Sequence, residues 1–419
     1  MSPRSVRTYE NRSPREKTVT EVKTAIVIGG GIAGPAAALA LRMAGIEAAV
    51  YEAHPSTADG LGGTLALAPN GVAALRVVGA DEAVTAIATP ISRQVMAVGG
   101  KRIALPGLAG LPPLQVVNRS DLYRVLHDQA VAGGVAIEYG RRLVGAEETA
   151  TGITARFADG STASADILVG ADGVHSTVRR LIDPNAPGPQ FTGLLGFEAV
   201  ARHEVDAQPG TMTFAFGKRG FYLYWPEPGG GTRWGVNLPQ ERPMSITEAR
   251  AVPSTDWMRT LRAAYADDDP GRDLMLTSSA DELQVVGSLH IMPPVPHWYR
   301  GRMVLVGDAA HAPSNSSGQG ASLAIESAVQ LARCLRDLPD VLSAYAAFER
   351  MRRGRVEKIA ARAARINHAK APGAVARALM SLLMPLMVKV AMNPEKRLGP
   401  ELRYVIDWDA LVTAESTLR

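Results

Sequence analysis

The sequence predicts an α/β protein with a Rossmann-like nucleotide-binding domain, a second domain built on a β-sheet, and helices at its C-terminal end. Three observations lead to this prediction. A glycine-rich loop lies between two short apolar runs near the N-terminus, two later apolar runs end in acid-plus-glycine turns, and Trp and Tyr gather in alternating segments between those turns. Strands buried on both faces are continuous apolar runs, whereas strands with one solvated face alternate.

The first element is a strand–loop–helix–strand unit over residues 24–52. An apolar strand leads into G-x-G-x-x-G, formed by Gly29, Gly31 and Gly34, and an Ala-rich helix and a second strand follow. In such units the glycines allow a tight turn, close approach of N–H groups to a pyrophosphate, and close helix–strand packing. Glu52 ends the second strand, where a carboxylate can bind both hydroxyls of a ribose. We therefore predict a dinucleotide site; the alternative is a glycine-rich structural turn.

Two later strands each end beside an aspartate. Asp172 follows the apolar run in residues 166–179, and Asp308 follows the one in residues 301–326. Ligands of α/β sheets bind at the carboxyl ends of parallel strands, so both aspartates are candidates for a binding site; helix capping is the alternative role. A helix predicted to begin near residues 318–320 has free N–H groups that can hold a polarised carbonyl oxygen.

Length and composition indicate a folded protein that is too long to form around a single hydrophobic core. The 419 residues favour two domains, and 46% hydrophobic with 21% charged residues is typical of globular proteins. A formal net charge of +4 favours anionic ligands without requiring nucleic acid, and we expect none. The single cysteine, Cys334, excludes an internal disulfide and a C-x-x-C pair, and it fits a cytoplasmic location.

Three segments near the ends of the chain have their own composition. Residues 1–21 are polar and are expected to form a disordered leader. The apolar stretch 378–392 is short and contains Pro385 and Lys389, so we expect a core or capping helix without a membrane span; a membrane-surface helix is the alternative. The arginine-rich run 350–365 is expected to be a solvated helix face.

A change in residue pattern, toward alternating strands rich in Trp and Tyr, divides the chain. We expect a discontinuous nucleotide-binding domain, a second domain and a C-terminal helical segment. The first comprises residues 22–92, 114–187 and 290–345, the second 93–113 and 188–289, and the last 346–419. Within the second domain, T-M-T-F-A-F and F-Y-L-Y-W-P predict an antiparallel sheet with one solvated face.

Four aromatic residues on these alternating strands are candidates for lining a site for a ring-shaped substrate: Tyr222, Tyr224, Trp225 and Trp234. Aromatic side chains offer large flat apolar surfaces for such a ligand. Because neighbouring residues of a strand point to opposite faces, about half of them are expected to face a core instead.

The three glycine-and-acid elements, in this order, resemble the group A FAD-dependent aromatic monooxygenases of the para-hydroxybenzoate hydroxylase fold. Relatives in that family include salicylate hydroxylase-like and tetracycline-inactivating enzymes. The resemblance spans about residues 22–350, and three ordered motifs are more specific than one. It implies FAD as cofactor, held by residues of all three motifs and by two others between them. These are Gly29, Gly31, Ala33, Gly34, Glu52, Thr64, Arg119, Asp172, Gly173, Gly307, Asp308, Gly318, Gln319, Gly320, Ala321 and Ser322.

The same resemblance implies that a loop containing Pro313 and Asn315 lies against the reactive face of the flavin; many family members have proline where this chain has Asn315. It also implies the reaction. NADPH or NADH, as a transient co-substrate, would reduce the flavin, and O2 would form a C4a-hydroperoxide that hydroxylates an aromatic or other electron-rich small molecule. A reductase or halogenase of the same fold, or a non-catalytic flavoprotein that sequesters a ligand, are the alternatives.

Two further expectations concern histidines and assembly. The histidines lack the spacing of metal ligands, so no metal is expected. His311 is expected to make a structural contact in its loop, with a catalytic role as the alternative. The chain is expected to be a monomer or a homodimer.

Overall fold

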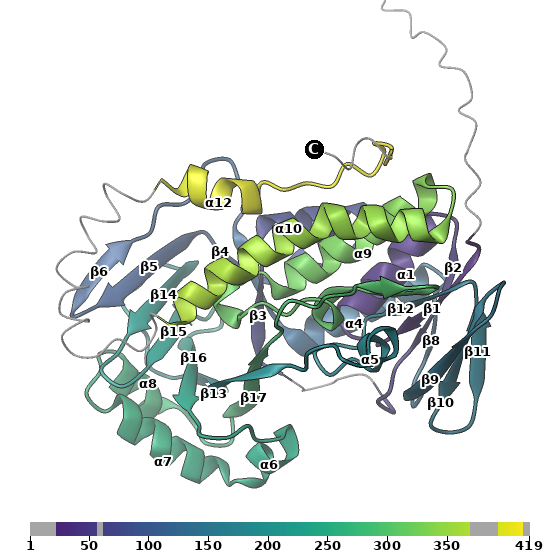
Figure 1. Cartoon of the computed structure of the whole chain (residues 1–419). Coiled ribbons are helices and arrows are strands. Elements are labelled where there is room, and N and C mark those ends of the chain that lie inside the picture. Colours follow the sequence, from purple (N-terminus) through teal and green to yellow (C-terminus); the bar gives the residue numbers. More distant parts are fainter. Residues whose placement is uncertain (1–21, 57–61, 369–392, 414–419) are drawn as a thin grey trace, which may run out of the picture.

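The computed structural model describes residues 22–56, 62–368 and 393–413. The expected leader and the apolar stretch 378–392 lie outside these ranges. The described residues form two lobes (Figure 1). We call the lobe around the six-stranded sheet the first lobe and the lobe around the seven-stranded sheet the second lobe.

The sheet of the first lobe is parallel except at one edge. Its strands, in spatial order, are β18 (Tyr299–Arg300), β19 (Met303–Leu305), β12 (Ile167–Gly170), β1 (Thr24–Ile28), β2 (Glu47–Tyr51) and β8 (Ala136–Glu138). β1 pairs in parallel with β12 and β2, and only β18 runs antiparallel to its neighbour. Val27, Val50 and Leu168 are fully buried, as expected for a sheet covered on both faces.

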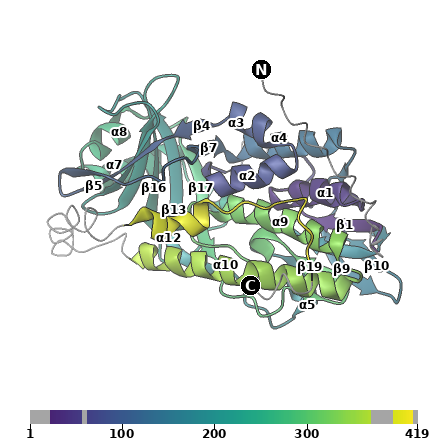
Figure 2. The ribbon, with the colours of Figure 1, turned by 90° about the horizontal axis from the view of Figure 1, so that it is seen from above.

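Helices from both ends of the chain cover this sheet. α1 (Ala33–Met43) packs against α9 (Gly320–Asp337), and α10 (Val341–His368) packs on α9. The remaining helices of the first lobe are α2 (Pro69–Val77), α3 (Asp81–Ala86), α4 (Arg119–Ala132) and α5 (Thr177–Ile182). α10 extends from the first lobe toward the second (Figure 2), so it lies along both.

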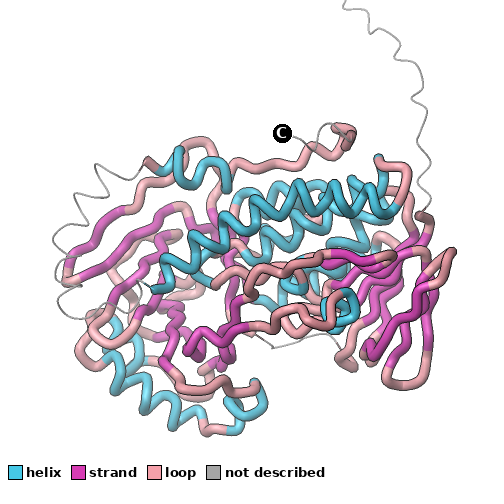
Figure 3. Tube along the Cα trace, viewed as in Figure 1, coloured by secondary structure: helices cyan, strands magenta, loops and turns pink. Residues whose placement is uncertain are grey.

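Two small sheets complete the first lobe. One has the order β3 (Thr64–Leu67), β7 (Leu114–Asn118) and β4 (Thr89–Ile91); the other has the order β11 (Thr162–Ala165), β10 (Ile153–Phe157) and β9 (Leu143–Glu148). Figure 3 shows strands gathered at the two ends of the molecule, with the long helices crossing between them.

The sheet of the second lobe takes two strands from an earlier part of the chain. Its spatial order is β17 (Gln284–Ile291), β13 (Gln190–Ala201), β16 (Thr232–Pro239), β15 (Phe221–Pro226), β14 (Thr211–Phe216), β5 (Arg93–Val98) and β6 (Lys101–Ala104). All neighbours are antiparallel except β14 and β5. The predicted antiparallel sheet is therefore mixed at one pair, because β5 and β6 join its edge from outside the segment that supplies the other strands.

Three helices of the described chain cover one face of this sheet. They are α6 (Ile246–Ala251), α7 (Ser254–Tyr265) and α8 (Gly271–Thr277). On α7, Trp257, Leu261 and Tyr265 recur every fourth residue, the spacing that places side chains on one helix face, and all three are buried. α6 begins with a capping box, in which Ser245 and Glu248 satisfy each other's backbone N–H groups.

Part of the arginine-rich run 350–365 contradicts the prediction of a solvated face, although its first and last arginines are exposed as predicted. Arg352 is fully buried and donates to Glu326 of α9 at 2.6 Å, and Arg355 donates to the same carboxylate at 2.9 Å. Arg362 pairs with Glu401 of α12 (Pro394–Leu402) at 2.6 Å. Because α10 lies between α9 and α12, several of its guanidinium groups are removed from water and need carboxylate partners.

Candidate functional site

A cavity of about 2400 Å³ is lined by residues of both lobes. The first lobe contributes the glycine loop after β1, the turn after β12 and residues 312–321. The second lobe contributes the sheet face that α7 and α8 leave uncovered. Ligand pockets are usually roughly 300–1,000 Å³, so this cavity has room for a dinucleotide and a second small molecule.

The glycine loop allows β1 and α1 to pack in contact. A Cβ atom at Gly34 would overlap the carbonyl oxygen of Gly29, and one at Gly29, where φ is +106°, would lie 2.5 Å from the carbonyl oxygen of Ala171. Gly29, Gly31 and Ala33 line the cavity, whereas Gly34 lies behind them in the strand–helix contact. The loop thus has the shape that brings backbone N–H groups close to a diphosphate.

Glu52 lines the cavity next to this loop and also holds it in place. Its Oε2 accepts a hydrogen bond from the N–H of Gly30 at 2.6 Å, and Oε1 accepts one from the N–H of His54 at 2.8 Å. The Glu52 carboxylate, which the motif predicts to bind a ribose, is therefore held in position by hydrogen bonds from the backbone, and the bond from Gly30 also stabilises the glycine loop.

Arg119 and Asp308 lie close enough in the cavity wall to affect each other's ionisation. Arg119 is the first residue of α4, and its pKa is raised by Tyr123 and by the Asp308 carboxylate. Burial raises the pKa of Asp308, and Arg119 offsets part of this increase. Arg119 Nε is buried and finds no acceptor within the described ranges. Leaving such a donor unpaired costs about 1–3 kcal/mol, so the site fits a ligand that brings hydrogen-bond acceptors.

Asp172 combines both roles that the sequence allows. It lines the cavity together with Gly173. Its Oδ2 also accepts hydrogen bonds from the N–H groups of Thr177 at 2.7 Å and Val178 at 3.1 Å, so it caps the start of α5. Burial raises the pKa of its carboxyl group, and these hydrogen bonds counter the increase.

The loop between β19 and α9 carries the third motif. At Gly307, φ is +58° and a Cβ atom would lie 2.8 Å from the Cβ of Ala33, so this residue allows the loop to lie against α1 without lining the cavity. The N–H of Gln319 donates to Ser317 Oγ at 3.0 Å, and the N–H of Gly318 donates to the carbonyl of Asn315 at 3.1 Å.

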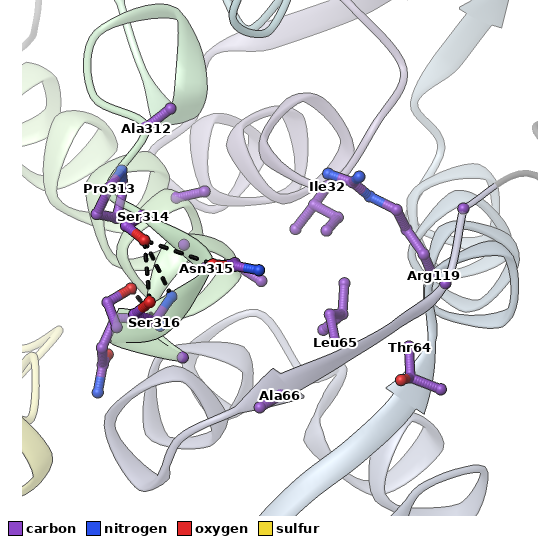
Figure 4. A pocket seen from close by; sticks show the side chains of 18 of the residues that line it. Ile32, Thr64, Leu65, Ala66, Arg119, Ala312, Pro313, Ser314, Asn315 and Ser316 are labelled. Carbon is purple, nitrogen blue, oxygen red and sulfur yellow. Dashed lines mark hydrogen bonds between the residues drawn. The ribbon is translucent and has the colours of Figure 1, made fainter. Parts of the chain in front are cut away.

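The free donors at the start of α9 therefore begin with Gly320 and Ala321, whose N–H groups have no acceptor in the described part of the chain. Both residues line the cavity, as do Gly318, Gln319 and Pro313. Asn315 projects into the cavity on the side opposite Arg119 (Figure 4). Thr64 lies on the cavity wall on β3.

Ser322 is not in the cavity wall, in contrast to its sequence-based assignment. Its Oγ accepts a hydrogen bond from the N–H of Ala68 at 3.1 Å, so it fastens α2 to α9. His311 is also buried away from the cavity, with Nε2 2.9 Å from Ser327 Oγ, and burial lowers its pKa to about 3. This is the structural contact expected for that residue.

Three of the four aromatic candidates lie in the core instead of the cavity. Tyr222, Tyr224 and Trp234 are at most 2% exposed and pack under α7 and α8. Tyr222 donates a hydrogen bond to the carbonyl of Asp269 at 3.3 Å, and Trp234 Nε1 donates to Ser278 Oγ at 2.8 Å. These three side chains are buried because α7 and α8 pack against the face of the sheet from which they project.

The opposite set of side chains forms the cavity wall. Trp225 belongs to it, together with residues that sequence reasoning missed: Met212, Phe214, Phe216, Phe221 and Leu223. A further missed residue is Glu198 on β13, a half-buried carboxylate whose pKa is raised to about 7 by burial. Both faces of these strands carry apolar or aromatic side chains in alternation, so the sequence does not indicate which face lines a cavity and which face packs in the core.

Two other site types have no counterpart in the described ranges. Among those residues no group of three or more His, Cys, Asp or Glu side chains is arranged to hold a metal ion. No helix among them is both long enough and apolar enough to cross a membrane.

Comparison with known proteins agrees with this geometry. The family model described as "FAD binding domain" matches residues 21–351. An FAD-dependent urate hydroxylase from Klebsiella pneumoniae is 30% identical over 360 residues, covering 83% of this chain and 91% of the relative. A 3-amino-4-hydroxybenzoate 2-monooxygenase from Streptomyces cremeus is 30% identical over 358 residues, covering 81% and 86%.

Solved structures share the fold. The crystal structure of Klebsiella pneumoniae HpxO with FAD and uric acid has a TM-score of 0.76 at 25% identity, covering 91% of this chain and 96% of that chain. The tetracycline destructase Tet(55) has a TM-score of 0.66 at 20% identity, covering 93% and 99%. The mixed α/β fold with a Rossmann-like lobe is therefore confirmed, and the chain belongs to the FAD-binding-domain family of group A flavoprotein monooxygenases.

Proposed function

We propose that this protein is an FAD-dependent monooxygenase that uses NADPH or NADH and O2 to hydroxylate an aromatic or other electron-rich small molecule. The observation that carries the proposal is a convergence. Three glycine-and-acid elements, far apart in sequence, line one cavity, and the facing wall is an apolar, partly aromatic sheet face.

The residues present fit FAD. The glycine loop and the start of α1 offer N–H groups to a diphosphate, with Glu52 beside them for a ribose. Arg119 Nε is a donor without an acceptor among the described residues, and the Asp308 carboxylate accepts no hydrogen bond from them. Both side chains can therefore form hydrogen bonds with polar groups of the cofactor. When bound, FAD supplies the oxygen-transfer chemistry.

The chain itself contributes binding, charge stabilisation and exclusion of water. The free N–H groups of Gly320 and Ala321 at the start of α9 can stabilise negative charge that develops nearby. Phe214, Leu223 and Trp225 give the opposite wall an apolar surface, which favours a flat ring and keeps water from a reactive centre. Oxygen transfer needs both properties in one cavity.

Isotope labelling tests this function. Purified protein is expected to show the visible spectrum of bound flavin and to consume NADPH or NADH faster when a substrate from a panel of phenols, anilines and indoles is added. Under ¹⁸O2 the product of that reaction is expected to contain one ¹⁸O atom. Reduction or halogenation of the substrate without label would show a different chemistry, and flavin that no panel member makes reducible would indicate ligand sequestration.

The Asp308→Ala variant is expected to lose flavin. Its carboxylate is the acceptor that the third motif brings to the cavity, and one charge-assisted hydrogen bond contributes about 1.5–3 kcal/mol, or at least about tenfold in affinity. The ratio of flavin to protein absorbance after desalting measures the loss. Asp281→Ala, at an exposed acid, is the matched control. Full flavin occupancy in Asp308→Ala would contradict the assignment.

Three sequence-based expectations remain proposals. We propose that residues 93–113 and 188–289 form a substrate domain, that residues 22–92, 114–187 and 290–345 form the FAD-binding domain, and that residues 346–419 form a C-terminal helical segment. We also propose a cytoplasmic location, supported by the single cysteine, and a monomer or homodimer.

A further inference from the structure

One carboxylate in the cavity wall belongs to none of the three cofactor-binding elements. Glu198 lies on β13 of the second lobe and reaches across to β3 of the first. Its Oε2 accepts hydrogen bonds from the N–H of Thr64 at 2.7 Å and from Thr64 Oγ1 at 3.0 Å. Oε1 has no hydrogen-bond donor in the part of the chain that the structure describes. The side chain lines the cavity, so this oxygen can accept a donor from a ligand.

The position of Glu198 in the sheet defines what lies beside it. Glu198 pairs with Gly235, Gly235 with Leu223, Leu223 with Phe214, and Phe214 with Met96. Directly paired residues of neighbouring strands point to the same face, and all five line the cavity. The row therefore has an acid at one end, a residue without a side chain next to it, and then a continuous apolar surface.

The gap at Gly235 gives a ligand access to the carboxylate. A Cβ atom there would lie 3.4 Å from Glu198 Cγ and 3.8 Å from Oε1, so any larger side chain would cover the acid. A flat ring that lies on Leu223 and Phe214 can extend over Gly235 and place its edge against Oε1.

No cation in the described part of the chain forms an ion pair with this acid. The charged group that acts on Glu198 is Arg233 on β16, which is already engaged in two hydrogen bonds of 3.0 Å with Glu227. Burial raises the pKa of Glu198 to about 7, so a substantial fraction of the carboxyl groups is ionised at neutral pH. A half-buried carboxylate with a free lone pair favours a cationic or N–H donor and repels an anion.

We propose that Glu198 selects the substrate: an aromatic compound whose ring lies on Leu223 and Phe214 and whose edge carries an amine or N–H donor toward Oε1. Aromatic carboxylates of the same size are disfavoured in this orientation. This inference rests on the proposed function, because it assigns the substrate class of the same cavity.

The test compares two ligands that share a ring and a hydroxyl group but carry opposite charge, 2-hydroxybenzylamine and salicylate. Binding to the FAD-loaded protein is measured from the change in the flavin spectrum, without turnover. The wild-type protein is expected to bind the amine at least about tenfold more tightly. Glu198→Gln keeps an oxygen acceptor for Thr64 and is expected to reduce this preference at least about tenfold, and Glu198→Lys to reverse it.

Glu282→Gln removes an equal charge at an exposed position ahead of β17 and is expected to leave the preference unchanged. An unchanged flavin spectrum without ligand in Glu198→Gln shows that the cofactor site is intact. Equal affinity for the two ligands, tighter binding of salicylate, binding of neither, or an unchanged preference in Glu198→Gln would overturn the proposal. Because binding is read without turnover, absence of ¹⁸O transfer would contradict the proposed function and leave the assignment of Glu198 standing.

Discussion

Glu326→Ala is expected to lower the free energy of unfolding by about 3–5 kcal/mol. Glu326 is fully buried in α9 and accepts hydrogen bonds from Arg352 and Arg355 of α10 and from Asn70 of α2. The variant would leave Arg352 buried without its carboxylate. The penalty of an uncompensated buried charge exceeds what the native pair contributes, because water no longer solvates that charge.

Urea denaturation followed by circular dichroism measures this effect. Arg242→Ala is the control, since Arg242 is exposed and pairs with Glu248 at 3.5 Å; such a surface pair is worth at most about 1 kcal/mol. Asn70 also donates to Gln319 Oε1 at 2.9 Å, at the cavity end of α9. Flavin affinity is therefore expected to fall together with stability. A change in unfolding free energy as small as that of Arg242→Ala would refute this account.

Gly34→Ala is expected to reduce both FAD affinity and stability. The added methyl group would overlap the carbonyl oxygen of Gly29, and neither backbone can move without separating α1 from β1. Overpacking of this kind costs about 1–3 kcal/mol. The same displacement moves the glycine loop in the cavity wall, so FAD affinity is expected to fall by at least about tenfold. Fluorescence titration of the apoprotein with FAD measures the affinity.

Gly354→Ala is the matched control for this substitution. Gly354 lies exposed in α10, with an ordinary φ and no atom within 4 Å of an added Cβ. There the change from glycine to alanine is expected to stabilise the helix by up to about 1 kcal/mol and to leave FAD affinity unaltered. If both variants bind FAD as the wild type does, close packing at Gly34 is not required for the site.

The parts of the site that could be predicted are those specified by local sequence. Gly29 follows β1 directly, Gly34 lies in the first turn of α1, and Glu52 follows β2, so the spacing of these residues alone fixes their relation. Asp172 and Asp308 follow apolar strands directly and were recognised in the same way. These elements depend on backbone geometry, which a short motif determines.

The residues that were missed or misplaced depend on contacts between distant segments. On β15, the local sequence does not show whether Tyr222 or Leu223 faces the cavity. This is decided by α7 and α8, which follow later in the chain and cover the face that carries Tyr222. Arg352 is buried only because α10 packs on α9. Glu198 was missed because nothing in its neighbouring residues shows that its strand faces a cavity.

The order of strands in the first lobe has a consequence for biosynthesis. β1 is synthesised long before β19, which lies on the far side of β12 in the same sheet, and before α9, which packs on α1; β19 and α9 lie at residues 303–337. The nascent chain must therefore keep the alanine-rich α1 without α9, and β12 without β19, until residues 303–337 have been synthesised. Such exposed surface is what chaperones bind, so production in a heterologous host is expected to depend on translation speed and chaperone supply.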